Sequence, residues 1–184
     1  MGRRVSMSAL LRALLLGCAL VAPALSIATE APRILLAEVY RDQADVSQYL
    51  ASEKLDGVRA LWDGQTLRFR SGKEIQAPSW FISGLPKVPL DGELWMGRGS
   101  FERLSGTVRR DVPVDSEWHQ VRYMIFELPG AAGNFRERAE QIRQLVRQAN
   151  VPWLQEIEQF SVVDRNSLKK RFNEVVKAGG EGLM

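Results

Sequence analysis

The sequence contains one cysteine and one histidine among its 184 residues, and both scarcities limit what the protein can be. A single thiol excludes the disulfide framework that stabilises many small secreted domains. Cys18 and His119 also cannot form the clusters of cysteine and histidine that hold structural zinc, so we expect no such site. A chain of this length can bury a sizeable core without either device.

The sequence also lacks an uninterrupted apolar run of about 20 residues, the length that a membrane-spanning helix needs. Its most apolar stretch, Ala13–Ala22, follows three arginines and precedes small residues at Ser26 and Ala28. This order is typical of a secretory signal peptide. We therefore expect residues 1–28 to be a signal peptide, and the mature protein to reside in the periplasm without a membrane segment. The alternative is a lipoprotein attached through Cys18.

An excess of charge is missing as well. The formal net charge is +3, but the three excess cations are Arg3, Arg4 and Arg12, which lie in the predicted signal peptide. Residues 29–184 carry equal numbers of basic and acidic side chains. Net charge therefore gives no argument for nucleic-acid binding, which would have to depend on local basic clusters.

Alternating apolar residues predict strands in the first half of the chain. The alternation on both sides of Asp63-Gly64 is typical of a β-hairpin. Further strands are predicted over Pro89–Trp95 and Val121–Leu128. Residues 29 to about 48 are expected to be a lead-in segment, with Ile34–Leu36 as a small apolar anchor.

Apolar positions spaced by three and four predict helices over Phe135–Ala149 and Ser167–Lys177 in the second half. Ser167 is expected to cap the second helix and Gly179-Gly180 to end it. A strand is expected to begin at Glu181. Antiparallel strands followed by helices indicate an α+β domain, and we expect this domain, residues 29–184, to be incomplete at its C-terminal end and truncated before its last strand.

The stretch Ser52–Arg59 is the most informative for chemistry, because it places Lys54 before a tight turn at Asp56-Gly57. A lysine amine is a nucleophile only when it is deprotonated, which partial desolvation and neighbouring cations favour. Arg59 and Arg70 are the candidate cations. The alternative is a surface lysine beside a hairpin turn.

The pattern Lys-x-Asp-Gly-x-Arg at Lys54–Arg59 resembles motif I of the covalent nucleotidyltransferases, which comprise DNA ligases, RNA ligases and capping guanylyltransferases. Four further motifs resemble those of this superfamily and follow in its order. They are motif Ia with Arg70, motif III with Glu93, motif IIIa with Phe126, and motif IV with Glu181.

The closest resemblance is to the small, exported bacterial ATP-dependent DNA ligases of the Lig E group. It rests on Ser52–Gly57 and on Gly92–Trp95 with Gly97-Arg98-Gly99. It implies an ATP-grasp-like nucleotidyltransferase (adenylation) domain of antiparallel sheets with flanking helices. Glu127 departs from the aspartate that follows the phenylalanine in many ligases.

The resemblance implies that Lys54 attacks the α-phosphate of ATP and becomes attached to AMP. The residues that it implies for ATP binding are Glu53, Arg59, Arg70, Glu93 and Phe126, of which Phe126 stacks on the purine. Glu93 and Glu181 are the implied ligands of Mg²⁺ or Mn²⁺. The implied partner is nicked double-stranded DNA, and we expect a monomer.

Two functions remain open from the sequence. One is an active ligase that passes AMP to a nick, and its nearest rival in the enzyme class is an RNA ligase. The other is a non-catalytic fragment or binding module with a ligase-like pocket. The family's motif V, with its pair of lysines, and its C-terminal OB-fold do not occur in the 184 residues. We therefore expect this chain to seal nicks inefficiently.

Overall fold

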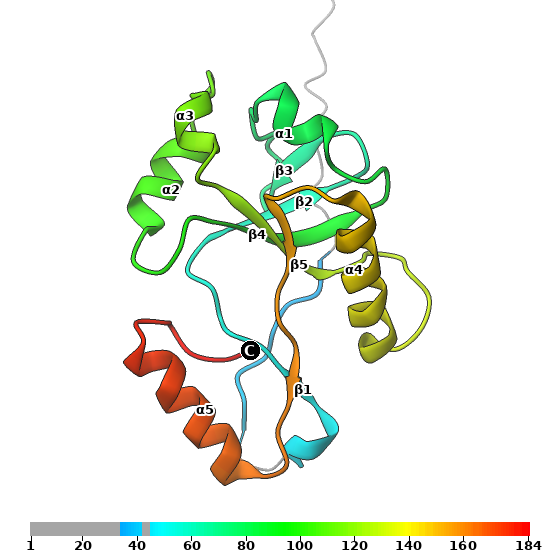
Figure 1. Cartoon of the computed structure of the whole chain (residues 1–184), viewed down its shortest axis with the longest axis vertical. Coiled ribbons are helices and arrows are strands. Elements are labelled where there is room, and N and C mark those ends of the chain that lie inside the picture. The colour runs from blue at the N-terminus through cyan, green and yellow to red at the C-terminus, as the bar shows by residue number, and fades with distance from the viewer. Residues whose placement is uncertain (1–33, 42–44) are drawn as a thin grey trace, which may run out of the picture.

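The structure is a computed structural model that describes residues 34–41 and 45–184. The predicted signal peptide, residues 1–28, lies outside the described residues. The described chain has a five-stranded sheet with helices around it and a smaller unit below, as seen in Figure 1. The α+β class predicted from the sequence is confirmed.

The larger sheet has the strand order β3-β2-β4-β5-β6. Its strands are β2 (Val58–Trp62), β3 (Leu67–Phe69), β4 (Leu90–Trp95), β5 (Arg122–Glu127) and β6 (Leu154–Glu156). The predicted hairpin is therefore confirmed as β2 and β3, and the two further predicted strands as β4 and β5. The expectation of purely antiparallel sheets needs one correction, because β6 pairs with β5 in parallel after the chain crosses over through a helix.

The hairpin turn forms because Asp63 binds the backbone that follows it. One oxygen of its carboxylate accepts hydrogen bonds from the amides of Gln65 at 2.8 Å and Thr66 at 2.7 Å. Gly64 has a φ of 99°, a conformation that glycine adopts without strain. The turn thereby sets the register in which Trp62 faces Leu67.

The core lies on one face of this sheet, because alternate strand residues point to the same side. From β4 and β5 it takes Leu90, Leu94, Tyr123 and Ile125, all of them buried. Three short helices complete this core, namely α1 (Ser79–Ser83), α2 (Phe101–Val108) and α3 (Asp115–Trp118), and no helix was predicted there. Segments of four to eight residues carry too little periodicity to be recognised.

Helix α4 (Phe135–Ala149) has the bounds predicted from its apolar spacing. It begins with a capping box, in which Asn134 accepts from the Glu137 amide and Glu137 accepts from the Asn134 amide. Its last turn ends at Asn150, which adopts the left-handed conformation with a φ of 50°. The helix packs against β5 and β6.

The smaller unit contains a short 3-10 helix, η1 (Val46–Gln48), the strand pair β1 (Leu50–Ala51) and β7 (Phe160–Ser161), and helix α5 (Arg165–Lys177). The predicted second helix is confirmed, but its predicted cap is wrong. Asp164 is the cap, because its carboxylate accepts from the Ser167 amide, and Ser167 bonds back to the Asp164 backbone. An aspartate three residues before the predicted start competes successfully with a serine.

Two further expectations for the ends of the described chain are wrong. The strand expected from Glu181 is only an isolated bridge between Glu53 and Leu183, because its pairing is confined to residues 52–54 and 182–184. The apolar anchor expected at Ile34–Leu36 is not buried: Leu35 is 70% exposed and Leu36 61%. The chain end returns to the middle of the molecule (Figure 1).

Within the ranges 34–41 and 45–184, no helix is both long and apolar enough to cross a membrane.

Candidate active site

The strand residues that point away from the core create a cleft. Arg59 on β2 lies opposite Glu93 on β4, and Glu93 lies opposite Met124 on β5, two residues before Phe126. Because side chains alternate along a strand, Arg59, Glu93 and Phe126 lie on the same face of the sheet. They line a cleft of about 560 Å³.

The other wall of the cleft comes from the smaller unit and from the chain end. It includes Leu50 of β1, and Glu181 and Met184 at the chain end. The cleft therefore lies between one face of the five-stranded sheet and a wall that includes β1, residues 52–57 and the chain end. Figure 1 shows the chain end beside the segment that runs from β1 to β2.

Lys54 projects from the segment that joins the two walls. Its amide donates to the Gly182 carbonyl at 2.9 Å, and its Nζ forms an ion pair with the Glu181 carboxylate. The two side chains are 51% and 39% exposed, so the pair is reachable from solvent. A Cβ at Gly57 would lie 2.5 Å from Cγ of Glu93, so glycine allows the chain after Lys54 to approach that strand.

Glu93 is the most strongly perturbed acid of the cleft. Burial raises its pKa to about 8, and the positive charges of Arg59 and Lys54 only partly oppose the shift. The nearby carboxylates of Asp91 and Asp56 add to it. A buried carboxyl that can take up or release a proton near neutral pH is often found at functional sites.

This shift predicts a pH dependence of stability. Because the pKa is higher in the folded than in the unfolded state, folding takes up a proton between about pH 4.5 and pH 8. The stabilising contribution is complete below pH 4.5 and is lost as the pH rises through 8. We expect the wild type to lose roughly 3–5 kcal/mol relative to Glu93→Gln over this window.

Urea unfolding of both proteins at pH 5, 6.5 and 8, with EDTA and without nucleotide, measures this difference. Parallel pH profiles for the wild type and Glu93→Gln would show that Glu93 does not titrate in this range.

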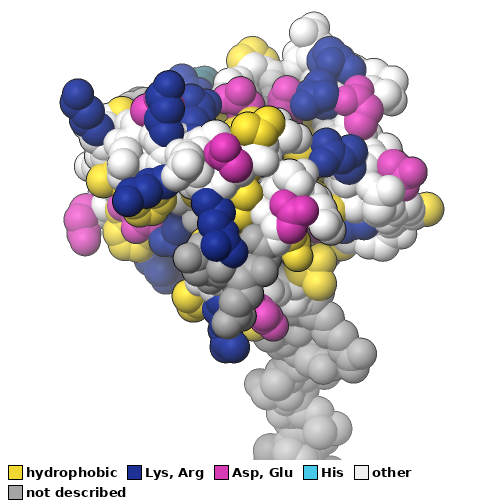
Figure 2. All heavy atoms as spheres, turned by 90° about the horizontal axis from the view of Figure 1, so that it is seen from below, with side chains coloured by type: hydrophobic (Ala, Val, Ile, Leu, Met, Phe, Trp, Pro, Cys, Tyr) yellow, Lys and Arg dark blue, Asp and Glu magenta, His cyan; other side chains and the backbone are white. Residues whose placement is uncertain are grey.

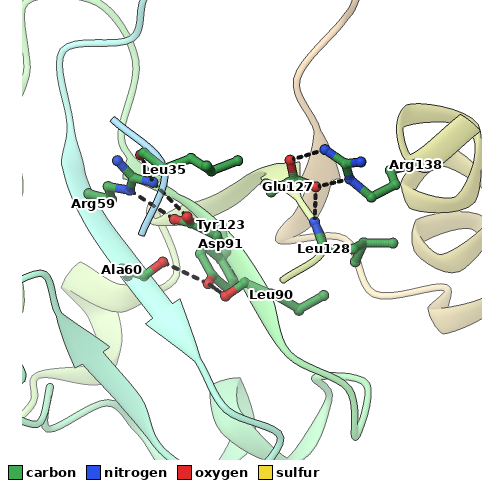
Figure 3. Close-up of polar contacts among 9 residues, drawn as sticks. All are labelled: Leu35, Arg59, Ala60, Leu90, Asp91, Tyr123, Glu127, Leu128 and Arg138. Carbon is green, nitrogen blue, oxygen red and sulfur yellow. Dashed lines mark hydrogen bonds and ion pairs between the residues drawn. The ribbon is translucent and has the colours of Figure 1, made fainter. Parts of the chain in front are cut away.

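Arg59 is held in place by two acceptors (Figure 3). Its Nε and Nη2 donate to the two oxygens of Asp91 at 2.9 and 2.6 Å, and Nη2 also donates to the Leu35 carbonyl at 2.9 Å. Asp91 is only 2% exposed, so this guanidinium supplies the hydrogen bonds that its buried carboxylate cannot obtain from water. The Arg59 guanidinium also lies 5.2 Å from the centroid of the Phe126 ring.

Glu127 secures the strand that carries Phe126 (Figure 3). Its two oxygens accept from Nε and Nη2 of Arg138 on α4, each at 2.7 Å, and one also accepts from the Leu128 amide at 2.8 Å. Burial alone would raise the pKa of Glu127, but these hydrogen bonds together outweigh it and lower the pKa. Many ligases have an aspartate at the position of Glu127. The longer glutamate reaches Arg138 and so binds helix α4 to the strand.

The structure brings together most of the residues singled out from the sequence. Those that line the cleft are Glu53, Lys54, Arg59, Glu93, Phe126 and Glu181. Arg70 does not line the cleft: it is exposed at the end of β3. The Glu53 carboxylate faces Arg98, with both of its oxygens accepting from that guanidinium at 2.7 Å.

Sequence reasoning missed Asp91 as the partner of Arg59, and Leu35, Leu36 and Phe135 as lining residues. A signal for Asp91 was present, since an acid inside an apolar strand needs a buried partner. The exposed leucines had no such signal, because their place depends on the tertiary fold.

In the part of the chain that the structure describes, no three His, Cys, Asp or Glu side chains are grouped so that they alone could hold a metal ion. The face seen from below in Figure 2 carries Lys and Arg side chains interspersed with Asp and Glu, in keeping with the balanced charge of residues 29–184.

We compared the sequence and the structure of this chain with those of known proteins. No family model matches the sequence. The chain is 32% identical over 151 residues to the DNA ligase of Haemophilus influenzae, a match that covers 82% of this chain and 55% of that protein. The chain thus spans about half the length of this curated relative.

Solved structures of DNA ligases are also similar to this chain. A structure from a study of Lig E DNA ligases, on DNA binding with a minimal scaffold, is 39% identical with a TM-score of 0.76, covering 80% of this chain and 59% of that one. The Chlorella virus DNA ligase–adenylate has 18% identity and a TM-score of 0.65, over 80% of this chain and 58% of that one. At that identity the similarity shows the fold alone.

Proposed function

Because this chain is a relative of the DNA ligases and has the fold of the nucleotidyltransferase domain of ATP-dependent DNA ligases, we propose that it transfers AMP from ATP to Lys54. The observation that carries the proposal is the placement of Lys54 in a cleft with an acid on each wall, Glu93 and Glu181, and an aromatic ring, Phe126. A nucleotide needs a stacking surface, a nucleophile at its α-phosphate and groups that balance the phosphate charge.

In the proposed step, the lone pair of Lys54 Nζ forms a bond to the α-phosphorus of ATP. The bond from that phosphorus to the bridging oxygen breaks, pyrophosphate leaves with the electron pair, and the amine loses its remaining excess proton to solvent. Glu181 forms an ion pair with Nζ, and this ion pair must open before attack.

The base of ATP is proposed to stack on Phe126, which is half-buried and lines the cleft. Arg59 lies beside this ring and uses two of its nitrogens for Asp91 and Leu35, so it retains N–H groups for a phosphate oxygen. Glu53 belongs to the same cleft. We leave Arg70 out of the proposed ATP site, because it does not line the cleft.

Mg²⁺, or Mn²⁺ in its place, would supply charge neutralisation at the phosphates when bound. Glu93 and Glu181 fit this ion, because they are hard oxygen donors in the same cleft. Two carboxylates with substrate phosphates and water are a usual donor set for Mg²⁺, whereas the described residues offer no cage of protein ligands.

For the whole protein we propose a nick-sealing DNA ligase. AMP would pass from Lys54 to the 5′-phosphate of a nick in double-stranded DNA, and the 3′-hydroxyl would then displace AMP. The signal-peptide pattern of residues 1–28 supports export to the periplasm, where the mature protein would act as a monomer.

The test of this proposal uses two nucleotides and two nicked substrates. With Mg²⁺ and α-labelled nucleotide, we expect a covalent label from ATP and not from GTP. We expect the label to move to the 5′-phosphate of nicked DNA faster than to that of nicked RNA. Labelling by GTP would indicate a capping-type activity, preference for RNA an RNA ligase, and absence of any covalent label a binding module.

A further inference from the structure

Arg98 is the one residue of the described chain whose side chain bonds both to the segment before Lys54 and to the turn before Glu181. Its Nε and Nη2 donate to the two oxygens of Glu53, each at 2.7 Å. Its Nη1 donates to the carbonyl of Ala178, the C-cap of α5, at 3.0 Å. All three guanidinium nitrogens therefore bind the two segments that lead to Lys54 and to Glu181.

The loop that carries Arg98 belongs to the larger sheet. It follows β4, the strand of Glu93, and its flanking glycines Gly97 and Gly99 have φ values of 101° and 67°. These left-handed conformations turn the backbone on both sides of the arginine. The guanidinium therefore links the strand of Glu93 to the two segments that carry Lys54 and Glu181.

Those two segments also pair with each other through their backbones. The Ser52 amide donates to the Met184 carbonyl at 3.0 Å, and the Met184 amide donates back to Ser52 at 2.8 Å. The Lys54 amide donates to Gly182 at 2.9 Å. This short ladder, defined by residues 52–54 and 182–184, fixes the position of Lys54 relative to Glu181.

The Glu53 carboxylate fits closely into the turn that it faces. A Cβ at Gly180 would lie 2.8 Å from Oε1 of Glu53 and 2.6 Å from a methyl of Val175. The carboxylate thus has little room to move, and Arg98 holds it from the other side by a planar, two-bond contact that lysine cannot reproduce.

From this geometry we propose that Arg98 is a positioning residue for the adenylation of Lys54. It touches none of the reacting atoms. It fixes the short ladder of residues 52–54 and 182–184 against the strand of Glu93, and so sets the distance between the nucleophile and the two acids. The inference rests on the proposed transfer of AMP to Lys54.

The expected effect is on the rate of attack more than on ATP binding. Small displacements of reacting groups lower rates strongly, and a shift of about 1 Å can cost about 100-fold. For Arg98→Gln we expect the rate of Lys54 adenylation at saturating ATP to fall about 30-fold, and the KM for ATP to change less than about threefold. Arg98→Lys should fall between the wild type and Arg98→Gln, because it keeps the charge and loses the planar contact.

The double variant Glu53→Gln/Arg98→Gln separates positioning from a general loss of charge. If both residues act through their mutual contact, the double variant should be no slower than the slower single variant. The matched control is Arg143→Gln, which removes an exposed arginine–glutamate pair on α4, away from the cleft. It should leave the rate unchanged.

Amide hydrogen exchange makes the inference testable apart from activity. In Arg98→Gln the amides of Ser52, Lys54 and Met184 should exchange at least about tenfold faster than in the wild type, while those of α4 stay unchanged. Faster exchange with a wild type that takes up no AMP would overturn the proposed function and leave the structural link standing. Unchanged exchange at these amides, or unchanged adenylation in Arg98→Gln, would overturn the positioning role.

Discussion

Replacing Lys54 by alanine is expected to abolish the covalent attachment of AMP and to lower ATP-dependent release of pyrophosphate by at least about 10³-fold. The reason is that the amine forms the bond to phosphorus, and in the described part of the chain no second lysine lines the cleft. Lys54→Arg should be equally inactive. It keeps a cation for Glu181, but a guanidinium stays protonated and cannot attack.

The folded state should survive this change. Lys54 is half exposed and its ion pair with Glu181 faces solvent, so its loss should alter stability by less than about 1 kcal/mol. Lys73→Ala is the matched control, since Lys73 also forms an exposed ion pair, with Asp111. Pyrophosphate release by Lys54→Ala at a rate near that of Lys73→Ala would show that the nucleophile lies elsewhere.

Arg59→Met is expected to cause the largest loss of stability among the variants of the cleft, about 3–5 kcal/mol in the free energy of unfolding. Methionine fills much of the space of the arginine stem but leaves the Asp91 carboxylate buried without its two charge-assisted hydrogen bonds. It also releases the Leu35 carbonyl. Urea unfolding followed by fluorescence, with the m-value checked for constancy, measures the change.

The cause of this loss can be separated from lost packing. In Arg59→Met/Asp91→Asn the buried charge is gone, so we expect the double variant to recover at least half of the stability that Arg59→Met loses. The exposed Arg143→Met should shift stability by less than about 0.5 kcal/mol. If Arg59→Met alone unfolds at the urea concentration of the wild type, then Asp91 does not depend on Arg59.

The sequence predicted the elements whose periodicity extends over several residues. Helix α4 has the predicted bounds because its apolar stripe and the capping pair Asn134 and Glu137 agree with each other. The hairpin of β2 and β3 was predictable because Asp63-Gly64 is a strong local turn signal. Such features depend on neighbours in the chain, which a sequence displays directly.

The features that failed depend on contacts between distant segments. Leu35 and Leu36 are exposed because they line an open cleft. Segments distant in sequence form that cleft, so the residues near these leucines in the chain do not predict it. The pairing of Arg59 with Asp91 joins residues 32 apart, and the bridge of Glu53 to Leu183 replaces an expected strand. Order in a set of motifs predicted which residues gather at the site, but not which of them bind one another.

Arg98 shows the same difference between local features, which the sequence predicts, and contacts between distant segments, which it does not. The glycines on either side of it mark a sharp turn, which the sequence displays, whereas its bonds to Glu53 and Ala178 span 45 and 80 residues. Arg70 is the opposite case, since its motif suggested a place at the phosphates, whereas it lies in the turn after β3, outside the cleft.

The most direct test of the central claim is peptide mass spectrometry of the wild-type protein after incubation with ATP and Mg²⁺. The account predicts one added AMP per chain, located on the peptide that contains Lys54 and removed by excess pyrophosphate, which reverses the step. An AMP adduct on any other residue, or an unmodified Lys54 in protein that has released pyrophosphate, would contradict it.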